Sequence, residues 1–291
     1  MANTGIEVLD APRFLLAMAT FLDLLGENEE LINDLNVYPV PDSDTGSNSL
    51  GTMSAALANL GPNDTDLFQI AGLLATSASS AARGNSGVIL AQYLSGLAGE
   101  MKQPITTAQW AIALQSGSSS ARAAVLTPAE GTMLTVADAA ADVIPVEDFA
   151  IYYSNIQSAV RSALARTQEL LPELRAAQVV DAGGAVIALM HEAFAITLGV
   201  SSKTLVINPR SHITKTNYSG PAFEVMFTAT CDNATRTLLE SQLQTLGDSI
   251  AIAGSAPNLT FHIHCNDPEA VLVQCEKLAE ISDFRITELG S

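Results

Sequence analysis

Two aspartates in a short acidic loop are the residues of this chain best suited to hold a metal ion. Asp42 and Asp44 stand two positions apart, after Pro39 and Pro41 and before a run of small polar residues that ends at Asn48. The prolines prevent a helix here and favour an extended or turned backbone. Because side chains two apart in an extended segment point to the same side, both carboxylates can face one cation. Hard oxygen donors of this kind suit magnesium.

The neighbouring sequence indicates what such a cation would do at a phosphate. No lysine or arginine occurs between Phe14 and Ala82, so metal, backbone N–H groups and helix N-termini would have to supply the positive charge. The chain contains no Walker A sequence, which excludes a P-loop. An EF-hand is excluded because the twelfth position counted from Asp42 is Met53 and not glutamate. The motif alone fits equally well a polar turn that caps a helix beginning near Ser47.

Four segments together resemble a known family. Residues 36–48 are similar to the metal loop of the dihydroxyacetone-kinase nucleotide-binding (DhaL-type) domain, in the version found in fatty acid kinase A. Residues 82–90, 128–136 and 180–184 continue the resemblance in the family's order. It is strongest over residues 8–200, and the remainder resembles the middle domain of that kinase. The resemblance implies a helical barrel with the nucleotide at one end.

The resemblance also implies roles for individual residues. Asp42 and Asp44 would hold two magnesium ions, with Asn36 near a third metal-binding position, and these three would be the catalytic residues. Ser43 departs from the pattern by replacing a glycine, and Ser49 replaces an apolar residue; Ser43 puts a Cβ where the family has bare backbone. The residues implied to contact ATP or ADP are Thr45, Gly46, Asn48, Gly84, Asn85, Ser86, Gly87, Gly131, Thr132, Met133, Asp181 and Gly183.

Composition restricts the class of protein and its partners. The 291 residues are 48% apolar and 15% charged, which indicates a globular chain of one large or two ordinary domains. The net charge of −18 argues against nucleic acid and anionic membranes as partners. The most apolar run, residues 14–25, is too short to span a membrane and follows acidic residues, so neither membrane insertion nor a signal peptide is expected. Three cysteines without a CxxC pair predict free thiols and a cytoplasmic location.

Hydrophobic periodicity predicts an all-helical first domain, residues 1–200, with about eight antiparallel helices. We expect Asp64 or Thr65 to cap the fourth helix, residues 84–87 to form a turn, and Pro128 to begin a helix. No strand-like alternation occurs before about residue 204. The expected helices occupy residues 10–25, 29–35, 50–60, 65–82, 88–101, 106–124, 128–140, 148–171 and 183–198.

The period changes to two after a linker at residues 201–220, in which residues 205–207 are expected to form a short docking strand. The second domain, residues 221–291, is predicted to have the ferredoxin-like order β-α-β-β-α-β. Its strands are expected to begin at residue 222 and to include residues 249–253, 259–265 and 284–289, with helices at residues 232–246 and 267–278. The chain is therefore predicted to combine a helical domain with a smaller α+β domain.

Two histidines in the second domain could ligate zinc. His262 and His264 lie on one face of a predicted strand. The family's middle domain has a similar His-x-His pair with a cysteine from its first strand, and Cys231 is the candidate for that third ligand here. Cys265 is expected to point to the opposite face. Two imidazoles without a certain third ligand make a weak metal site, so a structural polar strand face is the favoured interpretation.

Two functional hypotheses remain open. The first is a kinase subunit that transfers the γ-phosphoryl group of ATP, through two magnesium ions, to a small acceptor such as a protein-bound fatty acid or dihydroxyacetone (glycerone). Phosphoryl transfer depends mainly on positioning and charge neutralisation, which suits a loop with carboxylates and no basic residue. The resemblance implies a separate partner protein of the fatty-acid-binding type. The second hypothesis is a non-catalytic nucleotide-binding regulatory subunit. The oligomeric state, a homodimer included, is left open.

Overall fold

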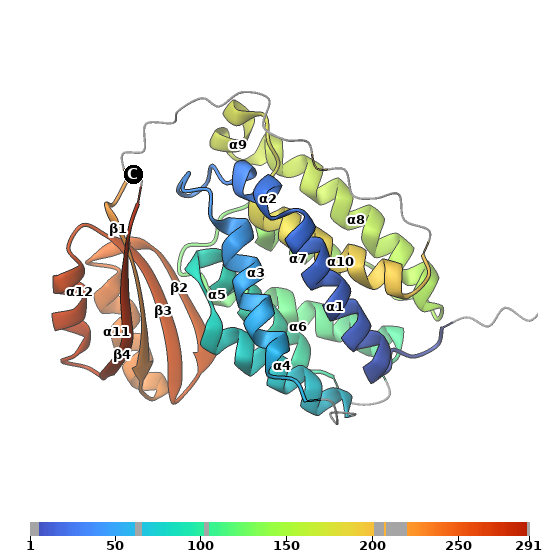
Figure 1. Ribbon diagram of the computed structural model, residues 1–291, viewed down its shortest axis with the longest axis horizontal. Helices are drawn as coiled ribbons and strands as arrows, with labels where there is room; N and C mark the ends of the chain where they lie inside the picture. Colours follow the sequence, from blue (N-terminus) through green and yellow to red (C-terminus); the bar gives the residue numbers. More distant parts are fainter. Residues whose placement is uncertain (1–5, 62–65, 102–104, 201–206, 208–219, 290–291) are drawn as a thin grey trace, which may run out of the picture.

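Helices make up the first two thirds of the chain, and a small antiparallel sheet with two helices follows them (Figure 1). The computed structural model describes residues 6–61, 66–101, 105–200, 207 and 220–289. A mostly helical N-terminal domain followed by a smaller sheet domain is therefore confirmed. No helix in these ranges has both the length and the apolar character that crossing a bilayer requires.

Ten helices lie in the described residues before position 201. The short segment at residues 29–35 is helical as expected, and the helix that was not expected is the six-residue α9. The helices are α1 (Ala11–Glu27), α2 (Glu29–Leu35), α3 (Thr45–Ala58), α4 (Leu67–Ala81), α5 (Gly84–Gly99), α6 (Thr107–Ala123), α7 (Met133–Ala141), α8 (Phe149–Leu170), α9 (Pro172–Ala177) and α10 (Ala182–Thr197).

Side-chain caps explain where several helices begin. The carboxylates of Asp10 and Asp148 accept backbone N–H groups of the first turns of α1 and α8. Thr106 and Gln109 form a capping box at α6. These positions agree with the sequence predictions, because an N-cap is a local pattern.

Four predicted helix starts differ from the structure, and one of them is α3, which begins at Thr45 and not at residue 50. Asp66 caps α4, and the predicted caps at residues 64 and 65 lie outside the described residues. Gly84 is the first residue of α5, so residues 84–87 form a first helical turn and not a separate turn. The segment from Pro128 to Thr132 is not helical, and α7 begins only at Met133, where the hydroxyl of Thr132 caps it.

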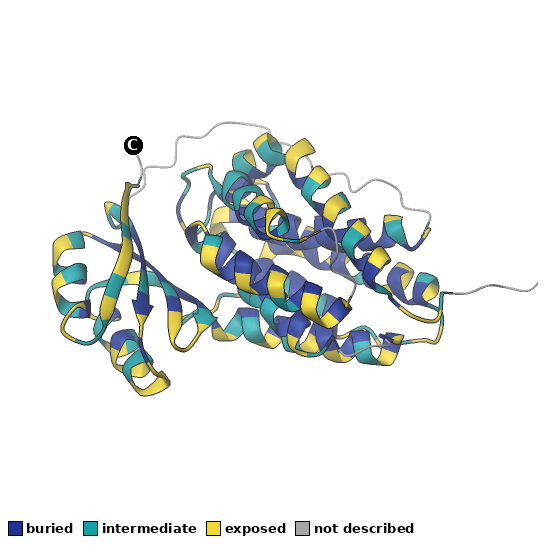
Figure 2. Cartoon of the chain, turned by 60° about the horizontal axis from the view of Figure 1, so that its bottom comes forward, coloured by how far each residue is buried: buried dark blue, intermediate teal, exposed yellow. Residues whose placement is uncertain are grey.

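The main core lies among the helices, with α10 at its centre. Its residues from Ala182 to Ala195 are all buried, as expected for a helix that is apolar on every side. Trp110 donates its indole N–H to the hydroxyl of Tyr153 at 2.7 Å, and Phe194 stacks on Tyr153. Figure 2 shows these buried residues inside and exposed residues on the outer helix faces.

The sheet domain contains β1 (Phe223–Thr230), α11 (Asn233–Leu243), β2 (Gly247–Ser255), β3 (Asn258–Cys265), α12 (Pro268–Cys275) and β4 (Glu280–Glu288). The strands lie in the order β2-β3-β1-β4, and neighbouring strands are antiparallel. One face packs against α11 and α12 in a second core. The other face carries Glu224 and Met226 of β1 and His262 and His264 of β3, and it turns towards the helices.

The two parts meet along the edge of the sheet at β2. Residues 124–126, which we call the junction segment, pair with β2: the Ile252 N–H donates to the Ala124 carbonyl at 2.9 Å, and the Leu126 N–H to the Ile250 carbonyl at 3.2 Å. Leu126 packs against the second core, whereas Ala251 belongs to the main core. Of the predicted docking strand, Ile207 alone is described, and it is buried; residues 205–206 and most of the predicted linker lie outside the described residues.

Candidate metal and nucleotide site

A cavity opens between the helices and the sheet at the acidic loop. Its walls come from residues 36–45, the start of α5, the segment that joins α6 to α7, the start of α10, and the sheet. None of the described residues that line it is a lysine or an arginine. The lining residues include ten of the predicted site: Asn36, Asp42, Asp44, Thr45, Asn85, Ser86, Thr132, Met133, Asp181 and Gly183.

Asn36 organises the acidic loop from within. Its amide nitrogen donates to the Val40 carbonyl at 2.9 Å and to a carboxylate oxygen of Asp42, and its amide oxygen accepts from the Thr45 hydroxyl. Asn36 is buried, with only 5% of its surface exposed. The side chain therefore fixes the loop's shape by hydrogen bonds, whereas the resemblance placed it near a metal-binding position.

Asp42 and Asp44 approach each other closely enough to interact. Burial and then the charge of Asp44 raise the pKa of Asp42 to about 7, and burial and then the charge of Glu224 raise the pKa of Asp44. One oxygen of Asp44 accepts from the Asn48 amide at 2.8 Å. Ser43 between them has φ 57°, a left-handed conformation that favours glycine. Two half-buried carboxylates that repel each other would be stabilised by a cation.

The start of α3 is capped by another helix. Asn33 of α2 accepts from the Gly46 and Ser47 N–H groups at 2.7 and 3.2 Å, and Ser47 donates to Glu29. A Cβ at Gly46 would stand 2.4 Å from the Glu29 carbonyl oxygen. Gly46 thus permits close packing of α2 on α3, and its N–H is already bonded. Asn33 was missed in the sequence because nothing local marks a contact between helices.

The start of α5 faces both the loop and the sheet. Gly84 has φ 56°, and a Cβ there would stand 2.3 Å from the Asn48 amide nitrogen. Its N–H approaches the sulfur of Met226 at 3.2 Å. Asn85 lines the cavity, and its amide oxygen is buried without a hydrogen-bond partner. Five predicted nucleotide residues are not among the lining residues: Gly46, Asn48, Gly84, Gly87 and Gly131.

The far end of the cavity is built by the starts of α7 and α10. Asp181 accepts from the Gly184 N–H at 2.6 Å, and its own N–H donates to the Thr167 hydroxyl. Burial raises the pKa of Asp181 to about 7. Gly183 lies against Met133, since a Cβ there would be 3.1 Å from the Met133 Cβ. The small residue keeps two helix starts together, and Met133 and Gly183 both line the cavity.

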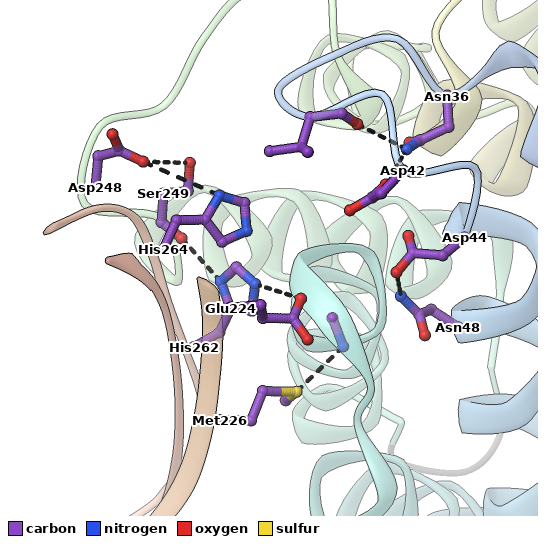
Figure 3. A network of polar contacts seen from close by, with 12 residues as sticks. Asn36, Asp42, Asp44, Asn48, Glu224, Met226, Asp248, Ser249, His262 and His264 are labelled. Atoms are coloured by element: carbon purple, nitrogen blue, oxygen red, sulfur yellow. Dashed lines mark hydrogen bonds and ion pairs between the residues drawn. The ribbon is translucent and has the colours of Figure 1, made fainter. Parts of the chain in front are cut away.

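The sheet contributes a wall of imidazoles and a carboxylate (Figure 3). His262 Nε2 lies 3.0 Å from Glu224, and His262 Nδ1 lies 2.9 Å from the Ser249 carbonyl. His264 lines the cavity, and its Nδ1 has no hydrogen-bond partner. Burial lowers the pKa of His264 to about 3. One ligand atom from each of Glu224, His262 and His264 lies within 4.8 Å of the others.

The predicted cysteine ligand is absent from this wall. Cys231 and Cys265 both belong to the second core, on the opposite face of the sheet from the histidines. Successive side chains of a strand alternate between faces, and Cys231 lies an odd number of residues from Glu224. The prediction that Cys265 points to the opposite face is confirmed. Cys231 cannot join the histidines, and Glu224 takes the place of the third ligand beside His262 and His264.

Comparisons with known proteins agree with this architecture. The family model described as DAK2 domain matches residues 39–196, more than half of the chain. The chain belongs to the DAK2 domain family. A second model, described as the middle domain of proteins that are like fatty acid kinase A, matches residues 220–291. The two matches divide this DAK2 protein between its helical part and its sheet.

Relatives of this DAK2 protein are longer chains. Protein YloV of Bacillus subtilis is 30% identical over 313 aligned residues, which cover 98% of this chain and 56% of YloV. An uncharacterized protein of Staphylococcus epidermidis is 37% identical over 181 residues, 58% of this chain and 32% of that protein. The chain thus spans about half the length of YloV. The dihydroxyacetone kinase of C. freundii, solved with AMP-PNP and Mg2+, has a TM-score of 0.49 and 19% identity over 68% of this chain and 36% of that one.

Proposed function

We propose that this chain is the nucleotide- and magnesium-binding part of a kinase that transfers the γ-phosphoryl group of ATP to a small acceptor. The observation that carries the proposal is the convergence of Asp42 and Asp44 in a cavity whose described lining residues include no lysine or arginine. Such a site suits a substrate whose negative charge arrives with its own divalent cations.

The residues present fit two magnesium ions. The carboxylates of Asp42 and Asp44 would hold them, and Asn36 would keep Asp42 in position through its amide. When bound, magnesium neutralises phosphate charge and bridges phosphate oxygens. Asn85 and Ser86, at the start of α5, stand where backbone N–H groups would meet a phosphate.

The nucleotide would extend towards the starts of α7 and α10. Thr132 and Met133 would line it, and Asp181 with Gly183 would close the cavity end. Binding in this orientation leaves the phosphates facing Glu224 and His264, so the acceptor would enter from the sheet side. The acidic loop on one side of the cavity and the sheet on the other would exclude water from the transferred phosphoryl group.

The second family model supports a proposal for the acceptor class. Its likeness to fatty acid kinase A supports a fatty acid presented by a separate binding protein, with dihydroxyacetone as the second candidate. We also propose a helical barrel over residues 1–200 and a ferredoxin-like domain over residues 221–291, supported by the eight longer helices and by the strand order β2-β3-β1-β4. The cytoplasmic location stays a prediction.

The decisive experiment follows ATP turnover against a panel of free and protein-bound acceptors. Asp42→Asn and Asp44→Asn should each abolish magnesium-dependent nucleotide binding and turnover, while Asp34→Asn, at an exposed position on α2, should change neither. Unchanged ATP affinity in both loop variants would overturn the proposal. Tight retention of ADP without acceptor-dependent turnover would instead favour a non-catalytic regulatory role.

A further inference from the structure

The acidic loop offers only two carboxylates to a cation. Asn36, the third polar side chain of the loop, uses its amide for bonds to Val40, Asp42 and Thr45. Buried polar groups that are bonded in this way are costly to release. A cation held by the loop alone would therefore have to draw further oxygen ligands from elsewhere, because hard cations take six or more.

Glu224 of the sheet domain reaches the same space. Its Oε2 lies 3.7 Å from the position that a Cβ would take at Gly84. The Asn48 amide nitrogen lies 2.3 Å from the same position, and this amide donates to Asp44. Asp42, Asp44 and Glu224 all line the same cavity. Figure 3 shows the three carboxylates turned towards one another across the cavity.

An imidazole of the sheet wall also lacks a hydrogen bond. His264 is 3% exposed and lines the cavity, yet its Nδ1 forms no hydrogen bond, and the nearest carboxylate oxygen, on Asp248, is 4.0 Å away. A buried polar group without a partner is costly. The sheet wall thus contains a buried nitrogen, Nδ1 of His264, without a hydrogen-bond partner.

We propose that Glu224 is the third carboxylate of the divalent-cation site, so that the cation links the sheet domain to the acidic loop. The inference rests on the proposed function, because it assigns a further ligand to one of the same two cations. Glu224 would act through its carboxylate, which the contact of Oε2 with His262 Nε2 at 3.0 Å holds in place. Without the cation, three carboxylates repel each other across the domain boundary.

A cation bound by both the acidic loop and Glu224 would affect how the two domains are arranged. A ligand that binds one arrangement more tightly than another shifts the population towards it. Because Glu224 reaches the loop only when the sheet is docked, divalent cation should favour the docked arrangement, and docking should strengthen cation binding equally. The proposal therefore predicts a change in shape on cation addition as well as a change in affinity.

The test compares Glu224→Gln with a matched control, Glu276→Gln, which removes a charge from the exposed surface just beyond α12. Mn2+ binding is titrated by calorimetry in the full chain without nucleotide, and small-angle X-ray scattering is recorded with and without Mg2+. We expect Glu224→Gln to weaken Mn2+ binding at least about 10-fold and to remove the Mg2+-dependent compaction. Circular dichroism confirms that the variant is folded, and Glu276→Gln should behave as wild type.

Two outcomes would overturn the inference while leaving the proposed function in place. One is wild-type Mn2+ affinity in Glu224→Gln together with lost affinity in Asp42→Asn. The other is a metal ion that stays bound to Glu224 and the histidines in Asp42→Asn, because Glu224 would then belong to a separate site. If Asp42→Asn and Glu224→Gln both bind as wild type, the proposed function fails as well.

Discussion

At the scale of single residues, Asn36 shows how a side chain can serve a site without being a ligand. It bonds to a carbonyl, a carboxylate and a hydroxyl of one short loop. The sequence located this residue correctly in the cavity, because the loop pattern is local. It could not reveal the direction of the amide, which depends on how the loop folds back on itself.

Replacing Asn36 by alanine should therefore loosen the loop. The change leaves the Val40 carbonyl and the Thr45 hydroxyl without their partner, and each unpaired buried group costs about 1–3 kcal/mol. We expect a loss of that order in the free energy of unfolding, measured in urea, and weaker Mg2+ binding by calorimetry. Asn59→Ala, at an exposed position after α3, should change neither. Wild-type Mg2+ affinity in Asn36→Ala would show that the loop holds its shape by other means.

The raised pKa of Asp42 predicts a pH dependence of stability. Burial and the charge of Asp44 raise it from 3.8 to about 7 in the folded protein. The folded state thus binds a proton more tightly than the unfolded state, so this contribution is complete below pH 3.8 and is lost as the pH rises through about 7. In metal-free protein, Asp42→Asn should flatten the decline in unfolding free energy between these pH values. Because burial also raises the pKa of Asp181, this residue adds a second decline in unfolding free energy with rising pH. That decline should persist in Asp42→Asn and disappear in Asp181→Asn.

At the scale of elements, the sequence predicted what is locally encoded. The helix starts at Asp10, Thr106 and Asp148 and the alternation of β1 and β3 follow from near neighbours along the chain. The starts of α5 and α7 do not follow from near neighbours along the chain. At Gly84, the first residue of α5, the missing Cβ lets the Asn48 amide approach, and the N–H contacts the sulfur of Met226. Such contacts join residues far apart in the sequence, so spacing could not predict them.

The cap that Asn33 gives to α3 can be tested at this scale. Asn33→Ala removes the acceptor for the Gly46 and Ser47 N–H groups, and loss of an N-cap costs about 1 kcal/mol. Asn33→Asp keeps an acceptor and should cost less. We expect faster hydrogen exchange at Gly46 and Ser47 in Asn33→Ala, while the exposed neighbour Asp34→Ala leaves both amides protected. Equal protection in all three variants would assign the cap to another group.

At the scale of the whole molecule, the site exists because the sheet docks on the helices. The acidic loop belongs to the helical part, whereas Glu224 and His264 come from the sheet, so neither part builds the cavity alone. The sequence predicted both parts and the polar strand face. It could not predict the pairing of residues 124–126 with β2, because an edge strand accepts any extended segment of suitable shape. That pairing also covers the exposed edge of β2.

The junction segment therefore sets the position of the sheet, and Leu126→Pro tests this. Proline removes the N–H that donates to the Ile250 carbonyl at 3.2 Å and also the side chain that packs on the second core. Leu126→Ala removes most of the side chain but keeps the N–H, so comparison of the two isolates the backbone bond. We expect Leu126→Pro to enlarge the radius of gyration in scattering and to expose the Ile252 amide to hydrogen exchange, with helical content unchanged. Leu126→Ala should show a smaller change in both. If Leu126→Pro keeps the wild-type radius and protects Ile252, the sheet is held by its other contacts with α5, and the pairing at the β2 edge only covers that strand.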